Sequence, residues 1–592
     1  MSLTTAEAGW LQGAAVIGAV AVLHVPLGDY MARVLGRTAA DCAASTEPDT
    51  PEEPEKPDKP ATRGRRGRSA ERAARDWRVE RLLYRLCGID PQAEQDWRQY
   101  LRSVFALSAA GIIVLYLILR FQARLPFSLG HGGLDPALAW NTAVSFTTNT
   151  SWQNYAGETT TGYTAVALGL GVEAFASAAV GLAVGLALVR GLARRQTEQL
   201  GNFWVDFTRS ITRVLLPLAV VSGVLLAGLG VIQNWAEPHT VSTLTGGAQS
   251  VPGGPVASWE PIKLISGDGG GFFNGNSAHP FENPGGWSNA VEIVLMLVVP
   301  AALLRTYGRM VGDTGQGWAL LAVAGSLFVL MAAGTGLAES QTSAGTATGA
   351  AHAAMEGKQV GFGTPGSALF GIAATSSADG AANASYDSFT ALGGGLLLSA
   401  MMLGEVSPGG VGSGLYGLLM IAIIAVFLGG LMVGRTPEFL RKRIGGRQMT
   451  HVALYYLTTP FVLLAGTALA IARPGERASI ANAGPHGLTE VLYAFTSSAN
   501  SNGSAFAGLN GNTTWYNTVL GLVMLLGRYL PMVFVLALAG SLARQKPGAV
   551  TAGTLRTTGP LFVTLTTASA LVLVGLTFLP ALALGPLAEA LR

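Results

Sequence analysis

Apolar stretches of about 20 residues recur along the whole chain and are separated by polar connections. This is the length that an α-helix needs to cross the hydrocarbon core of a bilayer. The pattern predicts an all-α polytopic membrane protein with about ten transmembrane helices. The predicted spans are residues 10–28, 98–120, 163–190, 210–232, 289–304, 318–336, 389–434, 450–472, 513–543 and 560–580.

Four connections between spans share a pattern of their own. Each contains an apolar segment too short to cross a bilayer, followed by a polar turn rich in Gly, Ser, Thr and Asn. The turns begin near Thr147, Ser266, Thr375 and Thr496, which are 119, 109 and 121 residues apart by subtraction of their numbers. The repetition predicts one unit, helix, half-helix, polar turn and helix, occurring four times in parallel orientation.

Irregular backbone at membrane depth is tolerated only where protein or water satisfies its polar groups. Four re-entrant turns are therefore expected to meet around one axis with their carbonyl groups directed inward. A ring of carbonyl oxygens replaces the hydration shell of a monovalent cation, and the carboxyl ends of the half-helices favour a cation there. Gly and Ser allow the close backbone approach that such a ring needs. The pattern predicts an ion-selectivity filter.

Two other interpretations of the turns compete with this one. The glycine-rich run 267–271 (GDGGG) resembles a phosphate-binding loop, but no Lys-Ser or Lys-Thr follows it and no strand precedes it. Gly, Ser and Asn also favour ordinary surface loops. A single turn would fit that explanation, whereas four turns at matched spacing disfavour it.

Composition and charge agree with a membrane protein and orient it. The chain is 49% hydrophobic and 12% charged, and basic residues are concentrated in alternate connections. By the positive-inside rule, these connections are cytoplasmic, both termini are extracellular and residues 29–97 are cytoplasmic. Residues 41–75 are acidic and proline-rich, then basic, which predicts a disordered insert. The basic half is interpreted as a solvated topology signal rather than a nucleic-acid site; contact with anionic lipid is the alternative. The basic connections are 63–85, 190–213, 435–447 and 544–556.

Several long motifs resemble one known family. They include GGGFFNGNSAHPFENP (269–284), NTAVSFTTNTSWQNYAGET (141–159) and SSANSNGSAFAGL (497–509). These segments resemble KdpA, the potassium-translocating subunit family of bacterial Kdp P-type ATPase complexes. The resemblance covers essentially the whole chain except 41–75. It implies four membrane–pore–membrane repeats of the potassium-channel-like transporter superfamily.

The resemblance also implies a domain organisation. It comprises the first helix with its cytoplasmic loop, four pore repeats of which the third contains a broken helix, and a final helix with the tail. The corresponding residues are 1–97, 98–190, 208–305, 317–434, 449–543 and 558–592.

Family membership would imply partners and a location. The partners are a KdpB-type P-type ATPase subunit, a KdpC-type subunit and a small KdpF-type subunit, in the plasma (inner) membrane of a bacterium. The chain itself has no Walker-type loop and no Asp-Lys-Thr-Gly-Thr phosphorylation motif. The expected ligand is therefore the transported potassium ion, with no organic cofactor, and ATP is used only by the partner.

The filter residues implied by the resemblance fall in the four turns. They are Thr148, Asn149, Thr150 and Gln153; Gly269, Gly270 and Gly271; Ala378, Asp379 and Gly380; and Ser498, Ala499 and Asn500. Asp268 and Asp379 depart from the family pattern. Their carboxylates are expected either to concentrate cations at an outward mouth or to form lateral hydrogen bonds.

Below the filter, residues 404–414 (GEVSPGGVGSG) contain helix breakers and match a gating loop of the family. A simple kink is the alternative. Arg528 is a charge inside an apolar span, where charge is costly and usually faces a cavity or partner. The resemblance makes it a barrier to direct leakage; pairing with Glu405 is the alternative. The expected gate and barrier residues are Gly409, Gly410, Gly412, Glu405 and Arg528.

Three rival functions compete with this one. A Trk/Ktr/HKT-type transporter shares the repeat plan but uses ion gradients, and the motif at 269–284 disfavours it. A membrane-embedded enzyme needs clustered acid, base or metal ligands, whereas the seven histidines are scattered and form no HExxH motif. A purely scaffolding subunit would not need four filter-like turns.

Overall fold

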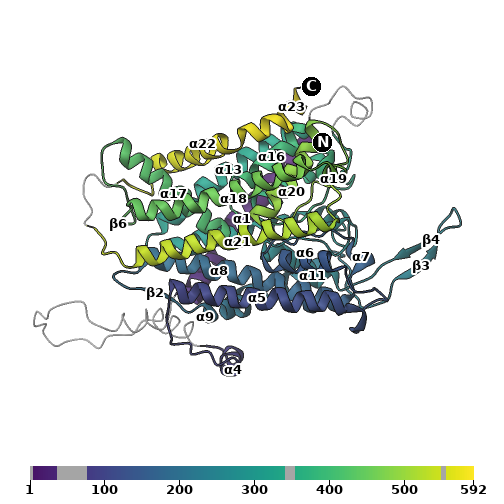
Figure 1. Ribbon diagram of the computed structural model, residues 1–592, viewed down its shortest axis with the longest axis horizontal. Coiled ribbons are helices and arrows are strands. Elements are labelled where there is room, and N and C mark those ends of the chain that lie inside the picture. The colour runs from purple at the N-terminus through teal and green to yellow at the C-terminus, as the bar shows by residue number, and fades with distance from the viewer. Residues whose placement is uncertain (1–4, 37–75, 341–353, 549–554, 592) are drawn as a thin grey trace, which may run out of the picture.

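A computed structural model describes residues 5–36, 76–340, 354–548 and 555–591. The whole of the predicted insert at 41–75 lies outside them. Within the described residues, ten helices are long and apolar enough to cross a bilayer, which confirms the predicted number. They run side by side across Figure 1. The spans are Gly9–Leu35, Trp97–Arg124, Ala165–Ala193, Phe203–Gly228, Gly286–Met310, Thr314–Ser340, Ser413–Met432, Gly446–Ala472, Thr514–Ala543 and Pro560–Leu584.

The helices that make up these spans carry the labels of Figure 1. They are α1 (Thr5–Leu35), α5 (Trp97–Phe121) with η1 (Gln122–Arg124), η2 (Ala165–Leu170) with α8 (Gly171–Ala193), α9 (Phe203–Arg209) with η3 (Ser210–Leu215) and α10 (Leu216–Gly228), α12 (Gly286–Met310), α13 (Thr314–Ser340), α17 (Ser413–Met432), α18 (Gly446–Ala472), α21 (Thr514–Ala543) and α22 (Pro560–Leu584).

Four shorter helices occupy the predicted half-helix positions. They are α6 (Pro136–Thr147), α11 (Val256–Ser266), α15 (Gly363–Ser376) and α20 (Pro485–Asn500). Local chemistry sets their starts: α6 begins with Pro136 at its first position, and the side chain of Asp135 accepts a hydrogen bond from the Ala137 amide at 3.0 Å. The fold therefore contains the four predicted membrane–pore–membrane repeats.

The third repeat contains the predicted broken helix. The helix α16 (Ala391–Met402) is followed by a non-helical loop, residues 403–412. The span α17 begins directly after this loop, at Ser413. The break falls in the glycine- and proline-rich segment, where helix propensity is lowest.

The remaining elements are short. Three two-stranded antiparallel sheets pair β1 with β2, β3 with β4, and β5 with β6; the β3–β4 hairpin projects from the bundle in Figure 1. The helices are α4 (Arg78–Leu86), α7 (Gly157–Thr160), η4 (Asn276–Ala278), η5 (Tyr386–Ser388), α19 (Pro474–Arg477) and α23 (Pro586–Ala590). The strands are β1 (Gln95–Asp96), β2 (Gln199–Gly201), β3 (His239–Ser242), β4 (Ala248–Val251), β5 (Glu438–Phe439) and β6 (Lys442–Arg443).

Helix α8 lies at the centre of the bundle. Within its most apolar window 89% of residues are buried, against 17% for the first span, so α8 faces protein and α1 faces mainly outward. Glycines allow this close packing: a Cβ on Gly181 would lie 2.4 Å from the Val411 carbonyl oxygen, and one on Gly191 would lie 2.6 Å from that of Ala539. Small residues bring helix backbones together in this way in membranes.

Candidate ion-binding site

The four polar turns share one backbone geometry. In each polar turn, one backbone amide donates a hydrogen bond to the carbonyl five residues earlier, which lies near the carboxyl end of the half-helix. The residue that precedes this amide has a left-handed φ. The bonds join Thr150 to Ser145 (2.9 Å), Asp268 to Lys263 (3.3 Å), Asp379 to Ala374 (3.1 Å) and Asn502 to Ser497 (2.9 Å). The left-handed residues are Asn149 (φ 60°), Gly267 (58°), Ala378 (58°) and Ser501 (63°). Thr150, Asp268, Asp379 and Asn502 are therefore equivalent positions.

Consecutive turns touch each other through their backbones. A Cβ on Gly503 would lie 1.6 Å from the carbonyl oxygen of Thr150, which joins the fourth turn to the first. A Cβ on Gly269 would lie 2.0 Å from the Gly380 nitrogen, and one on Gly380 would lie 2.8 Å from the Asn502 oxygen, joining the second, third and fourth turns. Such close approach excludes side chains at these glycines.

The first and second turns complete the ring. A Cβ on Gly270 would lie 3.2 Å from the Ser151 Cβ, and the Gln153 Oε1 accepts a hydrogen bond from the Gly271 amide at 2.8 Å. The side-chain Nδ2 of Asn149 also donates to the Gly267 carbonyl. We call these four turns, 148–153, 267–271, 378–381 and 501–504, the ring. They follow the carboxyl ends of the half-helices, whose partial negative charges favour a cation at the centre.

The predicted residues of the first three turns lie in the ring, but those of the fourth turn were placed too early. Ser498, Ala499 and Asn500 belong to the last turn of α20, and the fourth turn of the ring begins at Ser501. The helix α20 extends through Asn500, whose side-chain Nδ2 donates to the Thr496 carbonyl at 2.9 Å. The third and fourth repeats share a Thr-Ser-Ser sequence, which begins at Thr375 and at Thr496. The equivalent ring residue, Asp379 or Asn502, comes two residues later in the fourth repeat, and these two extra residues lengthen α20.

The two unexpected carboxylates are buried within the ring. Asp268 and Asp379 are 0% exposed. The Oδ1 of Asp379 accepts a hydrogen bond from the Ala381 amide at 3.0 Å. Its Oδ2, and both oxygens of Asp268, accept none from the described residues. At the equivalent position of the fourth turn, the side-chain Nδ2 of Asn502 donates to the Ala374 carbonyl at 3.1 Å. The two carboxylates do not project from an open mouth.

Asp379→Asn should therefore stabilise the protein. The amide keeps the shape of the side chain and removes the charge of a fully buried carboxylate that has one unpartnered oxygen; burying an incompletely paired charge costs about 1–3 kcal/mol or more. We expect a higher melting temperature in detergent. The reciprocal variant Asn502→Asp removes the donor to Ala374 and should lower the melting temperature. A lower melting temperature for Asp379→Asn would show that the ring needs the carboxylate.

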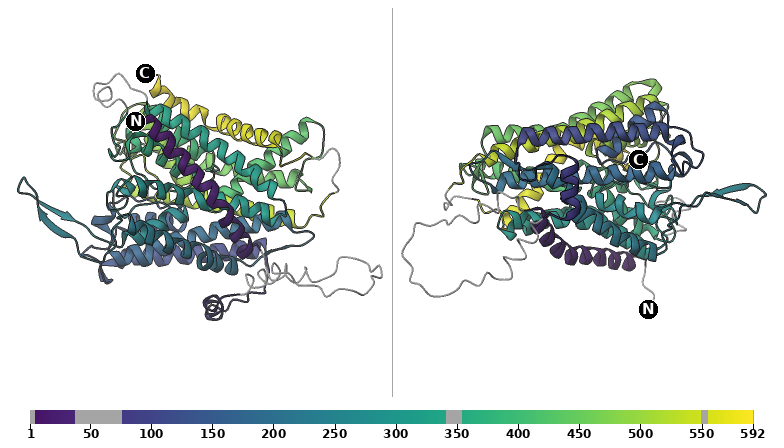
Figure 2. Two further views of the ribbon diagram at one scale, coloured as in Figure 1. Left: turned by 180° about the vertical axis from the view of Figure 1, so that it is seen from behind. Right: turned by 90° about the horizontal axis from the view of Figure 1, so that it is seen from below.

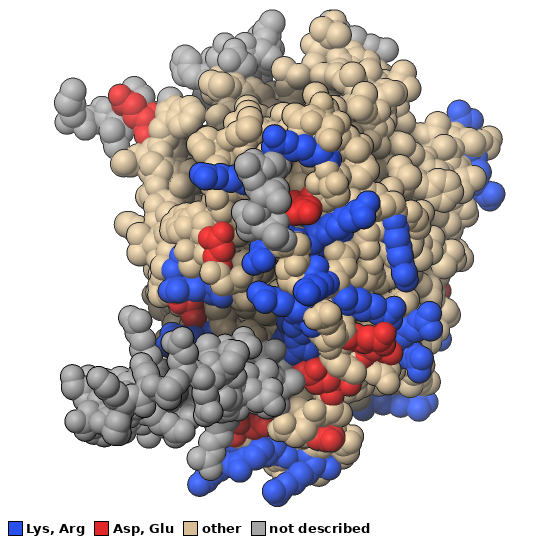
Figure 3. All heavy atoms as spheres, turned by 90° about the vertical axis from the view of Figure 1, so that its left-hand side faces the viewer, with Lys and Arg blue, Asp and Glu red and all other residues tan. Residues whose placement is uncertain are grey.

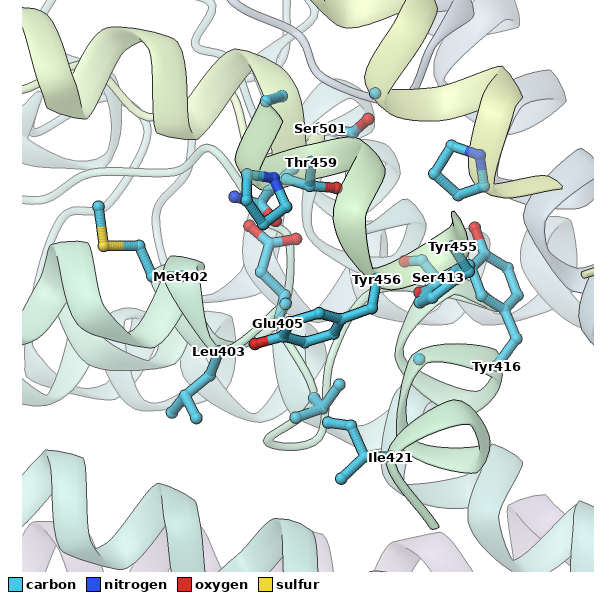
Figure 4. Close-up of a pocket in the computed structure, with 18 of the residues that line it drawn as sticks. Met402, Leu403, Glu405, Ser413, Tyr416, Ile421, Tyr455, Tyr456, Thr459 and Ser501 are labelled. Carbon is cyan, nitrogen blue, oxygen red and sulfur yellow. The ribbon is translucent and has the colours of Figure 1, made fainter. Parts of the chain in front are cut away.

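The charged residues of the expected gate line one small cavity, which Ser501 of the ring also lines. The cavity has a volume of about 70 Å³, and its lining includes Glu405, Arg528, Tyr416, Tyr455 and Asn500. Figure 4 shows the Glu405 carboxylate among Ser501, Thr459 and Tyr456. Glu405 and Arg528 are 2% and 5% exposed, and no ion pair joins them among the described residues. The Arg528 guanidinium donates to the Ser177 carbonyl on α8 at 3.2 Å.

The loop 403–412 packs between the third turn and α8. Its expected gate glycines allow contacts that a side chain would prevent. A Cβ on Gly410 would lie 2.7 Å from the Ala378 Cβ in the ring, and one on Gly412 would lie 2.1 Å from the Gly181 carbonyl oxygen. Gly409 and Gly412 also have φ values of 93° and 94°, which favour glycine. The loop thus lies directly against the ring.

Sequence reasoning missed a buried ionic network behind the second turn. Lys263, on α11, is fully buried and its Nζ lies 2.9 Å from a Glu260 carboxylate oxygen and 3.2 Å from one of Glu282. The same ammonium donates to the Asn276 side chain at 2.8 Å. Glu282 in turn accepts from the Phe273 amide at 2.6 Å. The network connects the half-helix α11 to the segment that follows the Gly269–Gly271 turn. The sequence contained one indication of it, a lysine within an otherwise apolar half-helix.

A second missed cluster lies outside the spans, at the start of α20. The two ring nitrogens of His486 each lie 2.8 Å from a carboxylate, one of Asp387 and one of Glu589. The bond to Asp387 is the main cause that raises the pKa of His486 to about 9, against a smaller opposing effect of burial. The protonated His486 therefore connects the third repeat and the carboxyl-terminal helix α23 to the fourth half-helix.

This cluster should make stability fall at alkaline pH. A folded-state pKa above the unfolded value contributes stability that is complete below about pH 6.5 and is lost as the pH rises through about 9. Between pH 8 and 10 the melting temperature of the parent should decrease more than that of His486→Gln. His239→Gln, an exposed position on β3, is the matched control and should follow the parent. Equal decreases in all three would exclude the cluster as the cause.

The fold and the ring define a class of protein: a single-chain membrane transporter built from four pore-helix repeats around one axis. The sequence model of the KdpA family, described as the potassium-transporting ATPase A subunit, matches residues 65–591. The chain belongs to this family.

Similar proteins are known from several bacteria. The potassium-transporting ATPase potassium-binding subunit of Mycobacterium avium (strain 104) is 51% identical over 595 residues and covers 100% of both chains. The subunit with the same name from Clavibacter michiganensis subsp. michiganensis (strain NCPPB 382) is 51% identical and covers 99% of each. The crystal structure of the potassium transporter TrkH from Vibrio parahaemolyticus has 14% identity and a TM-score of 0.49, over 73% of this chain and 84% of that one.

Proposed function

We propose that this chain binds potassium in the ring and passes it to a P-type ATPase partner for ATP-driven uptake. The observation that carries the proposal is the ring itself, four turns with the same backbone geometry that meet at the carboxyl ends of four half-helices. Backbone carbonyls gathered in this way can replace the hydration shell of potassium. The names of the full-length relatives support potassium as the ion.

The cavity beneath the ring supports a route that continues sideways to a partner. Glu405 attracts a cation that has left the ring, whereas Arg528 repels one that continues straight through. A fixed positive charge in a low-dielectric site is an effective barrier to a cation. Under this proposal the loop 403–412 is the gate, since it lies against the third turn, and the ion leaves through the side of the chain.

The partners under this proposal are a KdpB-type ATPase subunit, a KdpC-type subunit and a KdpF-type small subunit in a bacterial inner membrane. The relatives' names, which place them in a potassium-transporting ATPase, support an ATPase partner. The proposed orientation has both termini outside. The face opposite the chain ends carries many Lys and Arg side chains (Figure 3), as expected for a cytoplasmic face.

The test is growth on limiting potassium. A strain without its own potassium-uptake systems should grow when it expresses this chain together with the ATPase and accessory subunits, and should not grow with this chain alone. Growth with the chain alone that depends on the sodium or proton gradient would instead support a gradient-driven transporter.

A further inference from the structure

Helix α4 is oriented differently from the spans. It comprises nine residues, Arg78–Leu86. Figure 1 views it nearly along its axis, at the side of the bundle, whereas the spans run across the picture. The view from below in Figure 2 shows the same helix crossing the direction of the spans. If the spans are perpendicular to the membrane, α4 lies approximately parallel to its surface.

A buried ion pair fixes α4 to the beginning of the fourth span. Glu80 is 0% exposed; it pairs with Arg213, and one of its oxygens accepts from the Thr212 hydroxyl at 2.9 Å. Burial has the largest single effect and raises the pKa of Glu80, but the bond and charge of Arg213, together with the bonds from the Trp77 amide and the Thr212 hydroxyl, hold the pKa below its usual value. A second pair joins Asp76 to Arg209 at 2.8 Å. Four charged residues thus attach α4 to the fourth span, together with the buried Tyr84.

The rest of α4 presents two adjacent stripes away from the protein. The apolar stripe consists of Val79, Leu82, Leu83 and Leu86, whose exposed fractions are 59%, 56%, 38% and 73%. The basic stripe consists of Arg78, Arg81 and Arg85, which are exposed and form no ion pair with the described residues. At about 100° per residue, the two stripes occupy neighbouring sectors and the buried Glu80 and Tyr84 occupy the third.

The fourth span, to which α4 is attached, faces lipid along one side. Its exposed residues include Val220, Val221 and Val224, at 58%, 67% and 72% exposed. An apolar stripe beside that surface, with arginines next to it, is the pattern of a helix that lies in the membrane interface. Arginines near an anionic leaflet are attracted by its negative surface potential.

We propose that α4 is an interfacial anchor that binds the anionic lipid of the cytoplasmic leaflet, with its apolar stripe at the acyl-chain boundary and its arginine stripe at the lipid phosphates. The assignment of the leaflet rests on the proposed orientation, in which residues 29–97 are cytoplasmic. The helix thereby fixes the depth at which the fourth span enters the membrane. Because α4 lies far from the ring, this anchor does not depend on which ion is transported.

The test places a reporter on each stripe of the assembled complex. In a Cys42→Ser, Cys87→Ser background, Leu86→Cys and its matched control Arg85→Cys are labelled with bimane and reconstituted into nanodiscs that contain lipid with a nitroxide at acyl carbon 5. The label at position 86 should be strongly quenched and the label at 85 weakly. In discs containing phosphatidylglycerol the difference should exceed that in pure phosphatidylcholine, and Arg78→Gln with Arg81→Gln should abolish this lipid dependence.

Two results would overturn the proposal. Equal quenching at positions 85 and 86 would show that the apolar stripe does not face acyl chains. Quenching at 86 that appears only when the other subunits are removed would show that a subunit covers the stripe in the complex. Neither result would affect the proposed transport function, which is tested by growth, and potassium uptake by both labelled variants verifies that the complexes are assembled.

Discussion

Gly503→Ala should nearly abolish high-affinity potassium uptake. The new Cβ would lie 1.6 Å from the Thr150 carbonyl oxygen, and Gly503 has a φ of 93°. Overpacking of this kind costs about 1–3 kcal/mol, and a left-handed conformation costs a residue with a Cβ about 1–2 kcal/mol more. The fourth turn must therefore move away from the first, and the apparent affinity for potassium should fall by about 100-fold or more.

The control for this variant is Gly475→Ala in the same repeat. A Cβ at Gly475 meets no atom within 4 Å, so its uptake kinetics should match those of the parent. Both variants are compared as purified complexes with rubidium and sodium as competing ions, because displacement of one turn should also reduce selectivity. Parental affinity and selectivity in an assembled Gly503→Ala complex would show that ions do not pass through the ring.

Arg528→Met should uncouple ATP hydrolysis from transport. Arg528 is almost fully buried beside the cavity beneath the ring, and its guanidinium makes only one hydrogen bond within the described residues, to the Ser177 carbonyl. Two unit charges about 6 Å apart at an effective dielectric constant near 20 repel each other by about 3 kcal/mol. Without that repulsion, leakage of potassium should increase about 100-fold.

The measurement compares ATPase activity and ion flux on the same reconstituted sample. Arg544→Met is the matched control, since Arg544 is at the end of the same helix, is 46% exposed and pairs with Glu198 at 3.2 Å; its coupling should be unchanged. A structural role for Arg528 predicts a different result, with poor assembly and tight coupling in whatever complex remains. Normal yield with parental coupling would remove Arg528 from the mechanism.

The residues of the first three turns were predictable because each turn is local. A left-handed residue and one i to i−5 bond occupy about six residues, and the family motifs mark them. The fourth turn was misplaced for a physical reason. Its sequence, Thr-Ser-Ser-Ala-Asn, is compatible both with a turn and with one more turn of helix, and only packing against the neighbouring turns decides between them. Gly503 consequently escaped the prediction.

The buried acids show the same limit. From the sequence, Asp268 and Asp379 fitted both an electrostatic mouth and lateral hydrogen bonding, and only their complete burial in the ring locates them. The Glu405–Arg528 pairing was also an open alternative. The structure brings both residues to one cavity without an ion pair between them among the described residues.

The sequence by itself determined the ten spans, the four half-helices, the broken helix and the family, because hydropathy, helix breakers and motifs are local properties of the chain. Only the tertiary structure decided the order of the turns around the ring, the Lys263 network, the His486 cluster and the orientation of α4. The Lys263 network, the His486 cluster and the attachment of α4 all include contacts that local patterns do not encode, and so does the ring. The bond from Asn149 to Gly267 joins residues 118 positions apart, and that from Asn502 to Ala374 spans 128. Contacts over such distances depend on how the repeats close around one axis, which no local pattern of residues specifies.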